Sequence, residues 1–219
     1  MDAANRDGRE SVSVNRHSSA ERRRSGPEWL GFLRAFLRAP STVGAVLPSS
    51  AHLARMMLAG HDLQRARVVV ELGPGTGAFT RFIEQAAHPE AVILALEVDA
   101  SAVAWLRERH PRVQIEHDSA ERIRAQLRSR GLDRADAILS GIPWAAMPAA
   151  LQERIMGEVR AAMAPSAWFS TFTYLHSPRT ARGAAYAALL ARSFARVERS
   201  PMVWRNFPPA FVYRCATSA

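Results

Sequence analysis

The feature that most constrains the fold of this chain is a glycine-rich turn placed directly after a buried strand. Residues 67–72 read Arg-Val-Val-Val-Glu-Leu, a β-branched run typical of a strand covered on both faces. Gly73, Gly75 and Gly77 follow within five residues. Glycine is favoured where the backbone takes a positive φ or lies close to a ligand. A strand, such a turn and then a helix predict a nucleotide-binding unit, with the ligand at the carboxyl ends of parallel strands.

After this turn the sequence alternates between strand and helix patterns, which predicts a parallel sheet with helices on both faces. The expected strands are 67–72, Ala91–Glu97, Val113–His117, Ala135–Ser140 and Ala167–Thr173. The expected helices are Ala78–Ala87, Ser101–His110, Glu121–Arg130, Ala149–Ala164 (closed by Pro165) and Arg182–Phe194. Two last segments, Val197–Val203 and Ala210–Cys215, are predicted to pair antiparallel around an Asn206–Pro209 turn.

The 219 residues predict one domain with an extension before it. Residues 66–219 are expected to form the Rossmann-like domain. Residues 1–26 are polar and arginine-rich, so we predict a disordered basic tail. Residues 27–65 are predicted to hold two helices that cap the domain or contact a membrane. These are an amphipathic helix over Trp29–Arg38 and a helix over Ala51–Ala59, capped by Ser49 or Ser50.

The net charge is +9, and all 29 basic residues are arginine. A GC-rich coding sequence would explain the absence of lysine but not the excess of positive charge. That excess predicts an anionic partner, either nucleic acid or an acidic membrane surface. Cys215 is the single cysteine, so no internal disulfide and no metal site are expected. No apolar run approaches the roughly 20 residues of a membrane span. We therefore expect a cytoplasmic protein that is peripheral at the inner membrane face.

Three acidic residues stand at the ends of predicted strands. Glu71 precedes the glycine turn, and Glu97 ends the second strand about 20 residues after it, where an acid reaches ribose hydroxyls. Asp118 follows the third strand, where it can accept a hydrogen bond from an adenine amino group. Two simpler interpretations stay open: Asp99, near Glu97, and Asp118 each suit the cap of the helix that follows.

The run Glu-Leu-Gly-Pro-Gly-Thr-Gly, residues 71–77, resembles motif I of the class I methyltransferases, and the likeness spans about 67–214. This resemblance implies a seven-stranded, mostly parallel sheet and S-adenosylmethionine as cofactor. It places the cofactor ribose at Glu97 and the adenine at Asp118. Other residues expected to bind the cofactor are Glu71, Gly73, Gly75, Gly77 and Ser50. The spacing differs from the G-x-G-x-x-G of nicotinamide dehydrogenases.

Three further runs resemble soluble bacterial phospholipid N-methyltransferases, which methylate the amine of phosphatidylethanolamine at the membrane surface. They are residues 41–50 (STVGAVLPSS), 140–143 (SGIP) and 203–210 (VWRNFPPA). The resemblance implies a phospholipid amine as methyl acceptor and a membrane surface or phospholipid as partner. Trp144 and residues 172–177 match no known pattern of that family, which leaves the acceptor open.

The alternative interpretation of the segment after the fourth strand is an rRNA adenine N6-methyltransferase, with RNA as partner. That family has N-[IL]-P-[YF] after the fourth strand, whereas residues 141–144 read Gly-Ile-Pro-Trp and lack the asparagine. The chain also shows no helical RNA-binding domain after its last strand. The sequence is compatible, too, with a small-molecule amine as acceptor and with a cofactor-binding protein that has no turnover. No obligate protein partner is evident.

Candidate acceptor-site residues lie after the fourth and fifth strands. Tyr174 and the carbonyl of Ser140 or Gly141 are expected to hold the amine. His176 suits a general base, since the pKa of histidine lies near neutrality, although it also suits an ordinary surface loop. Substrate contacts are expected from Trp144, His176 and Arg205. Arg205 would bind a phosphate, or would simply be a solvated arginine of the hairpin.

Overall fold

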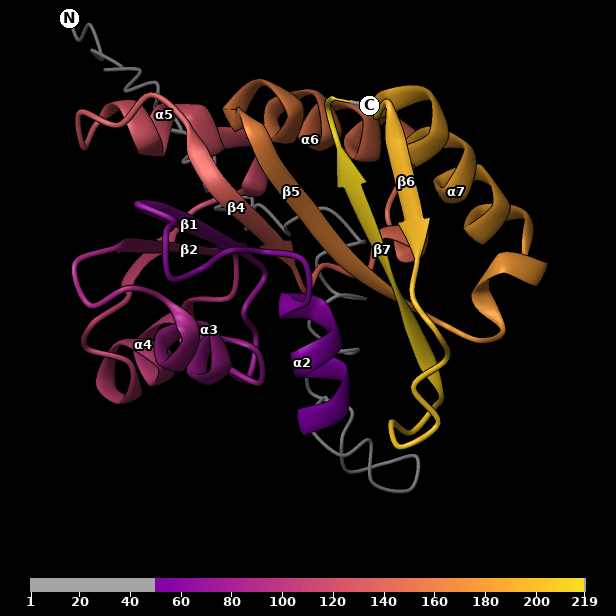
Figure 1. Ribbon diagram of the computed structural model, residues 1–219, viewed down its shortest axis with the longest axis horizontal. Coiled ribbons are helices and arrows are strands. Elements are labelled where there is room, and N and C mark those ends of the chain that lie inside the picture. Colours follow the sequence, from indigo (N-terminus) through magenta and orange to yellow (C-terminus); the bar gives the residue numbers. More distant parts are fainter. Residues whose placement is uncertain (1–49, 219) are drawn as a thin grey trace, which may run out of the picture.

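A seven-stranded sheet with the order β3-β2-β1-β4-β5-β7-β6 forms the centre of the computed structural model, which describes residues 50–218 (Figure 1). The strands are β1 (Val68–Leu72), β2 (Val92–Glu97), β3 (Gln114–His117), β4 (Ala135–Ser140), β5 (Met163–Tyr174), β6 (Arg196–Arg199) and β7 (Ala210–Ala216). Strands β1 to β5 are parallel, and β7 is antiparallel to both β5 and β6. The predicted seven-stranded Rossmann-like class is confirmed. The tail 1–26 and the helix Trp29–Arg38 lie outside the described residues.

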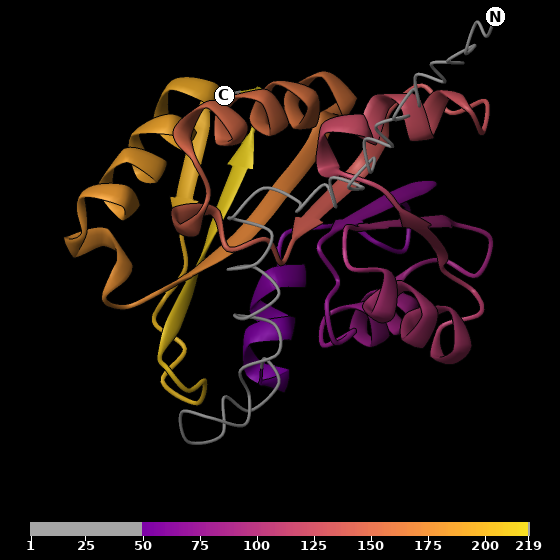
Figure 2. The same cartoon turned by 180° about the vertical axis from the view of Figure 1, so that it is seen from behind.

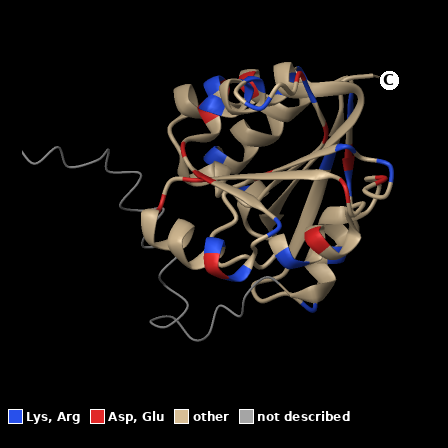
Figure 3. Ribbon diagram, turned by 90° about the vertical axis from the view of Figure 1, so that its left-hand side faces the viewer, with Lys and Arg blue, Asp and Glu red and all other residues tan. Residues whose placement is uncertain are grey.

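Helices cover both faces of the sheet (Figure 2). They are α2 (Ala51–Leu58), α3 (Thr80–Ala86), α4 (Ala100–Arg109), α5 (Ile123–Arg128), α6 (Ala149–Ala162) and α7 (Ala181–Ser193). Three short 3-10 turns are η1 (Ala120–Arg122), η2 (Trp144–Ala146) and η3 (Ser177–Arg179). The apolar sides of α2, α3 and α4 pack into one core cluster, and those of α5, α6 and α7 into a second on the other face. Basic and acidic residues lie together on the helices and loops around the sheet (Figure 3).

Side-chain caps begin several of these helices. Ser50 Oγ accepts from Leu53 N at 3.2 Å, which confirms a serine cap on α2. Asp99 Oδ1 accepts from Ser101 N and Ala102 N, so Asp99 caps α4 as the simpler interpretation predicted. Ser119, rather than Asp118, caps η1. Each cap satisfies an amide that would otherwise lack a partner in the first helical turn.

The boundaries differ from prediction where proline was expected to end a helix. Helix α6 ends at Ala162, and β5 begins at Met163, so Pro165 lies inside the strand. The pairing of β4 with β5 is irregular between Met163 and Trp168, and the missing amide of Pro165 therefore costs no ladder hydrogen bond. At the other end, β6 stops at Arg199, earlier than predicted, because Pro201 has no amide to extend the ladder.

The chain reverses its direction of winding at β1, which pairs with β2 on one side and β4 on the other. Leu72 at the end of β1 is in register with Ser140 at the end of β4, and Gly141 N donates to Leu72 O at 2.8 Å. The glycine turn and the segment after β4 therefore lie side by side. Ligands in open α/β sheets bind at such a switch point.

Candidate active site

The glycine turn after β1 adopts a backbone that only glycine takes without strain. Gly73, Gly75 and Gly77 have φ values of +67°, +55° and +73°. A Cβ at Gly77 would meet His110 Nε2 at 2.8 Å, and one at Gly73 would meet Ile142 Cγ1 at 3.0 Å. The turn therefore presents bare backbone to the carboxyl edge of the sheet.

Glu97, at the end of β2, binds this turn directly. Its Oε2 accepts from Gly75 N at 3.0 Å, while Oε1 accepts from Val98 N at 2.8 Å and Asp99 N at 2.9 Å. Burial raises the pKa of Glu97, and the three backbone hydrogen bonds offset part of that rise. The carboxylate is therefore held in one position beside the glycine turn, where the sequence predicts contact with the cofactor ribose.

Glu71, on β1, is fully buried, and within residues 50–218 neither of its carboxylate oxygens has a hydrogen-bond partner of good geometry. Burial raises the pKa of Glu71 to about 8, and the charges of Glu97 and Glu84 add to the rise, while the nearby Thr80 hydroxyl lowers it. A carboxyl group with that pKa is mostly protonated near neutral pH, so the Glu97 carboxylate is the group that makes this region attractive to a cation. S-adenosylmethionine carries cationic ammonium and sulfonium groups, so the residues present fit that cofactor.

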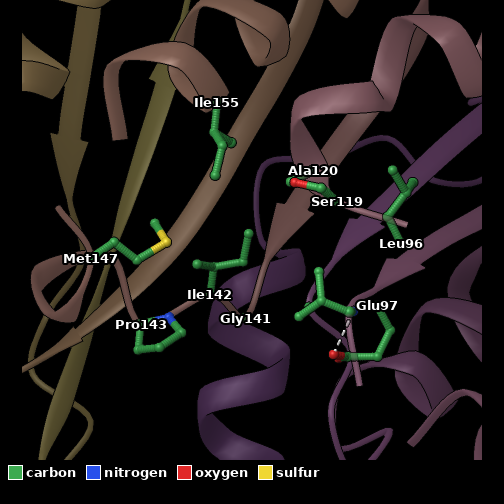
Figure 4. A pocket seen from close by; sticks show the side chains of 11 residues that line it. Leu96, Glu97, Ser119, Ala120, Gly141, Ile142, Pro143, Met147 and Ile155 are labelled. Atoms are coloured by element: carbon green, nitrogen blue, oxygen red, sulfur yellow. Dashed lines mark hydrogen bonds between the residues drawn. The ribbon is translucent and has the colours of Figure 1, made fainter. Parts of the chain in front are cut away.

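A pocket opens between the ends of β1, β2, β3 and β4, with about 450 Å³ of empty space including its mouth. Figure 4 shows Glu97 on one side and Ile142 and Pro143 on the other. Its lining is mostly apolar and comprises Gly73, Leu96, Glu97, Val98, Ser119, Ala120, Gly141, Ile142, Pro143, Met147 and Ile155. We call this the cofactor pocket. Met147 and Ile155 in this lining were missed from the sequence because they belong to no motif, whereas Ile142 and Pro143 belong to the SGIP run but were not assigned to the cofactor.

Two other residues predicted to bind the cofactor hold local contacts outside this lining. The Asp118 carboxylate accepts from Arg122 Nε at 3.0 Å and Gln126 Nε2 at 2.6 Å, and its neighbour Ser119 lines the pocket. Ser50 caps α2, and its amide donates to Asn206 Oδ1 at 3.0 Å. The cofactor contacts of Asp118 and Ser50 stay predictions.

The segment after β4 packs so closely on the glycine turn that position 141 has no room for a side chain. A Cβ on Gly141 would lie 2.6 Å from the backbone oxygen of Gly73. Next to it, Ser140 Oγ accepts from Trp144 Nε1 at 3.0 Å. The hydroxyl of Ser140 is therefore engaged within the core. Ser140 is fully buried and Gly141 lines the cofactor pocket, so the contact of either carbonyl with a methyl acceptor stays a prediction.

A second, larger pocket lies beside the first, between β4, β5 and α7, with about 940 Å³ of empty space including its mouth. We call it the acceptor pocket. Its lining comprises Ile142, Pro143, Trp144, Ala145, Ala146, Phe172, Thr173, Tyr174, His176, Ser177, Thr180, Arg182 and Tyr186. Ile142 and Pro143 line both pockets, so the two spaces meet at the end of β4. No carboxylate appears among the described residues that line it.

The structure brings three of the predicted substrate residues to this pocket. The rings of Tyr174 and His176 are parallel, with centroids 6.0 Å apart, and burial raises the pKa of Tyr174. Trp144 reaches the lining, but its ring is buried and stacks on Tyr186 at 5.2 Å. Trp144 therefore acts mainly as a packed wall.

Arg205 does not line the acceptor pocket: it lies on the loop before β7, with Nη1 3.3 Å from His52 Nε2. Arg182 lines the pocket instead, from the first turn of α7. Sequence reasoning missed Arg182 and Tyr186. The one available signal was Thr180, a helix cap whose side chain accepts from Gly183 N, which places the next residues at a helix start.

Strand order, glycine turn and strand-end acid together define the class: the protein is a class I S-adenosylmethionine-dependent methyltransferase. No protein-family model matches the chain. It is 31% identical over 189 residues to the ornithine lipid N-methyltransferase of Singulisphaera acidiphila, covering 84% of this chain and 93% of that protein. The chain belongs to the same family as that enzyme.

Solved structures show the same fold at low sequence identity. The glycopeptide N-methyltransferase MtfA, complexed with sinefungin, aligns with a TM-score of 0.59 and 13% identity over 74% of this chain and 91% of its own. Magnesium protoporphyrin IX methyltransferase from Synechocystis, with bound S-adenosylmethionine, aligns with a TM-score of 0.56 and 10% identity, covering 74% and 75%. These similarities confirm the predicted fold.

Proposed function

We propose that the protein methylates the amine in the headgroup of a membrane lipid, and that phosphatidylethanolamine is one such acceptor. The observation that carries this proposal is the junction of the two pockets at Ile142 and Pro143. A methyl acceptor in the larger pocket lies next to the cofactor pocket, as an in-line transfer requires. The related enzyme from Singulisphaera acidiphila acts on another amine-bearing lipid, ornithine lipid, which supports this class of acceptor.

The lining of the acceptor pocket suits an amine in its neutral form. Its walls are largely apolar, and the polar side chains are hydroxyls, His176 and Arg182, with no carboxylate among the described ones. An ammonium ion without a carboxylate partner is costly to bury, so the amine enters reaction geometry after losing its proton. The bound cofactor supplies an electrophilic methyl group on a good leaving group. The protein therefore needs mainly to position and desolvate the nitrogen.

Named residues take up these tasks in the proposal. The Tyr174 hydroxyl and the carbonyl of Ser140 or Gly141 orient the amine. His176, stacked on Tyr174, receives the proton that the ammonium loses. Glu97 and the backbone of the glycine turn hold the cofactor. Glu71 lies buried behind the turn with its pKa raised to about 8.

Position 141 argues against adenine N6 methylation. The rRNA enzymes that the segment resembles use an asparagine there, and in this protein a side chain at Gly141 would collide with the Gly73 carbonyl. Methylation of RNA is therefore the less favoured alternative, and rRNA is included among the acceptors assayed below.

The test is methyl transfer from labelled cofactor to separate acceptors. These are phosphatidylethanolamine, ornithine lipid, phosphatidylglycerol as a lipid without an amine, rRNA, and free ethanolamine. Label in an amine lipid, and none in phosphatidylglycerol or RNA, is the expected result. Label in RNA or only in free ethanolamine would overturn the lipid assignment. Label in ornithine lipid but not in phosphatidylethanolamine would overturn the proposal that phosphatidylethanolamine is an acceptor.

A further inference from the structure

The loop between β6 and β7, residues 200–209, exposes two large aromatic side chains at its tip. Trp204 is 70% exposed and Phe207 64% exposed, with Arg205 between them in sequence. Trp105 on α4 is the next most exposed large apolar side chain described, at 39%. Neighbouring exposed aromatics of this size commonly mark a binding surface.

Polar contacts, rather than the aromatic rings, hold this loop in place. Asn206 is buried; its Oδ1 accepts from Ser50 N at 3.0 Å and its Nδ2 donates to Pro208 O at 2.7 Å. Val203 N donates to Ala210 O at 2.7 Å. The backbone of the loop is thus fixed by its own hydrogen bonds and by α2. These contacts do not involve the rings of Trp204 and Phe207, which stay largely exposed.

The loop stands next to the acceptor pocket. Its last residue, Pro209, accepts a hydrogen bond at 2.9 Å from Leu175 N, and the following Ala210 pairs with Tyr174. The loop also extends past the ends of the strands beside α2 (Figures 1 and 2). A surface that contacts Trp204 and Phe207 therefore lies at the same edge of the molecule as Tyr174 and His176.

The groove between this loop and α2 is basic. His52, Arg55, Met56, Met202, Trp204 and Arg205 line it, with about 880 Å³ of empty space including its mouth. Arg55 and Arg205 are exposed, and neither forms an ion pair with an acidic residue of the described part. Arginines beside exposed tryptophan and phenylalanine combine the two attractions that a bilayer interface offers, anionic phosphates and an apolar layer beneath them.

We propose that residues 200–209 and the first turns of α2 form a membrane-docking surface for a bilayer that contains anionic lipid. Trp204 and Phe207 enter the boundary between headgroups and acyl chains, and Arg55 and Arg205 contact lipid phosphates. This inference rests on the proposed function in one respect: docking here places the acceptor pocket at the lipid headgroups. It is separate from the predicted contact of Trp29–Arg38, which lies outside the described residues.

The first experiment measures sedimentation of the full chain with vesicles of phosphatidylcholine, alone or mixed with phosphatidylglycerol. The parent should bind the mixed vesicles. Trp204→Ser with Phe207→Ser, and separately Arg55→Glu with Arg205→Glu, should each weaken that binding by about 10-fold or more. The matched control is Arg65→Glu with Arg128→Glu: both arginines are exposed, the change in net charge is the same, and they precede β1 and β4, at the opposite edge of the sheet. The control should bind like the parent.

The second measurement separates docking from folding and from catalysis. The Trp204→Ser, Phe207→Ser variant should keep the parental melting temperature, and should keep methyl transfer to an amine lipid dispersed singly in detergent. A fall of several degrees, or a change from dimer to monomer, would show that residues 1–49 or a second copy covers the rings, and would overturn the proposal. Unchanged vesicle binding in both loop variants would overturn it too. Vesicle binding without methyl transfer to any lipid would reject the proposed function and leave the docking surface standing.

Discussion

The two pockets at the carboxyl edge of the sheet are built in different ways. The cofactor pocket depends on backbone. It borders a turn of three glycines with positive φ, of which Gly73 lines it, and its lining includes Gly141, which has no room for a side chain, and Glu97, whose buried carboxylate accepts from three amides. The acceptor pocket depends on side chains contributed by the segment after β4 with η2, and by β5, η3 and α7, with aromatic residues in its walls. Backbone cradles demand particular residues, whereas aromatic walls admit many. A methyltransferase can therefore change its acceptor more readily than its cofactor.

Gly141→Ala should have the largest effect and should reduce the affinity for the cofactor. The added Cβ would lie 2.6 Å from the Gly73 carbonyl and push the glycine turn out of place. We expect a loss of about 100-fold or more in cofactor affinity, measured by calorimetry, since misplacing a cradle costs several hydrogen bonds at once.

Gly157→Ala is the matched control, because nothing lies within 4 Å of a Cβ at that position of α6. It should leave affinity unchanged and raise stability by up to about 1 kcal/mol. Parental cofactor affinity in a folded Gly141→Ala protein would show that the close packing of the two segments is not needed for binding.

Glu97→Ala should have the next largest effect. It removes the acceptor of three backbone hydrogen bonds and the predicted contact with the ribose. Hydrogen bonds to a charged group contribute about 1.5–3 kcal/mol, so cofactor affinity should fall roughly 10–100-fold. Glu108→Ala, which removes an exposed acid of α4, serves as control. Calorimetric affinity equal to that of the parent would contradict the role of Glu97.

Tyr174→Phe should affect the acceptor pocket without affecting the cofactor pocket. The ring and its stacking on His176 are kept, and only the hydroxyl, which we propose orients the amine, is lost. We expect kcat/KM for the lipid acceptor to fall about 10-fold, the value of one hydrogen bond, while the Kd of the cofactor stays constant. If cofactor affinity falls in parallel with activity, the two pockets are not separable in this way.

Glu71→Gln tests the buried charge through pH. The pKa of Glu71 is raised from 4.5 to about 8 in the folded protein, so the folded state retains a proton that the unfolded chain releases. This group therefore makes the cofactor-free protein less stable as pH rises from about 4.5 to 8, by at most about 1.4 kcal/mol per pH unit. In Glu71→Gln that decline should be smaller across the same window in chemical unfolding. Equal slopes for parent and variant would show that Glu71 is ionised without penalty.

The features of the fold that the sequence predicts are those set by residues close together in the chain. The strand and helix order, the antiparallel end of the sheet and the cap at Asp99 were predicted because each depends on neighbours in sequence. The predicted end of α6 at Ala164 is wrong, because Pro165 lies inside β5 and does not terminate the helix. It is tolerated in β5 at an irregularity that arises only when β4 pairs alongside. Boundaries set by pairing partners are decided far away in sequence.

For the site, the sequence by itself determined the glycine turn, the acid at Glu97 and hence the class of cofactor, because backbone geometry restricts which residues serve there. It also marked Tyr174 and His176 as residues at a strand end. Only the tertiary structure decided that Arg182 and Tyr186 join them while Arg205 lies elsewhere, and that the two pockets meet at Ile142 and Pro143. The physical reason is that an aromatic or aliphatic wall has no local conformational signature: its members are chosen by packing between segments that meet only when the sheet forms.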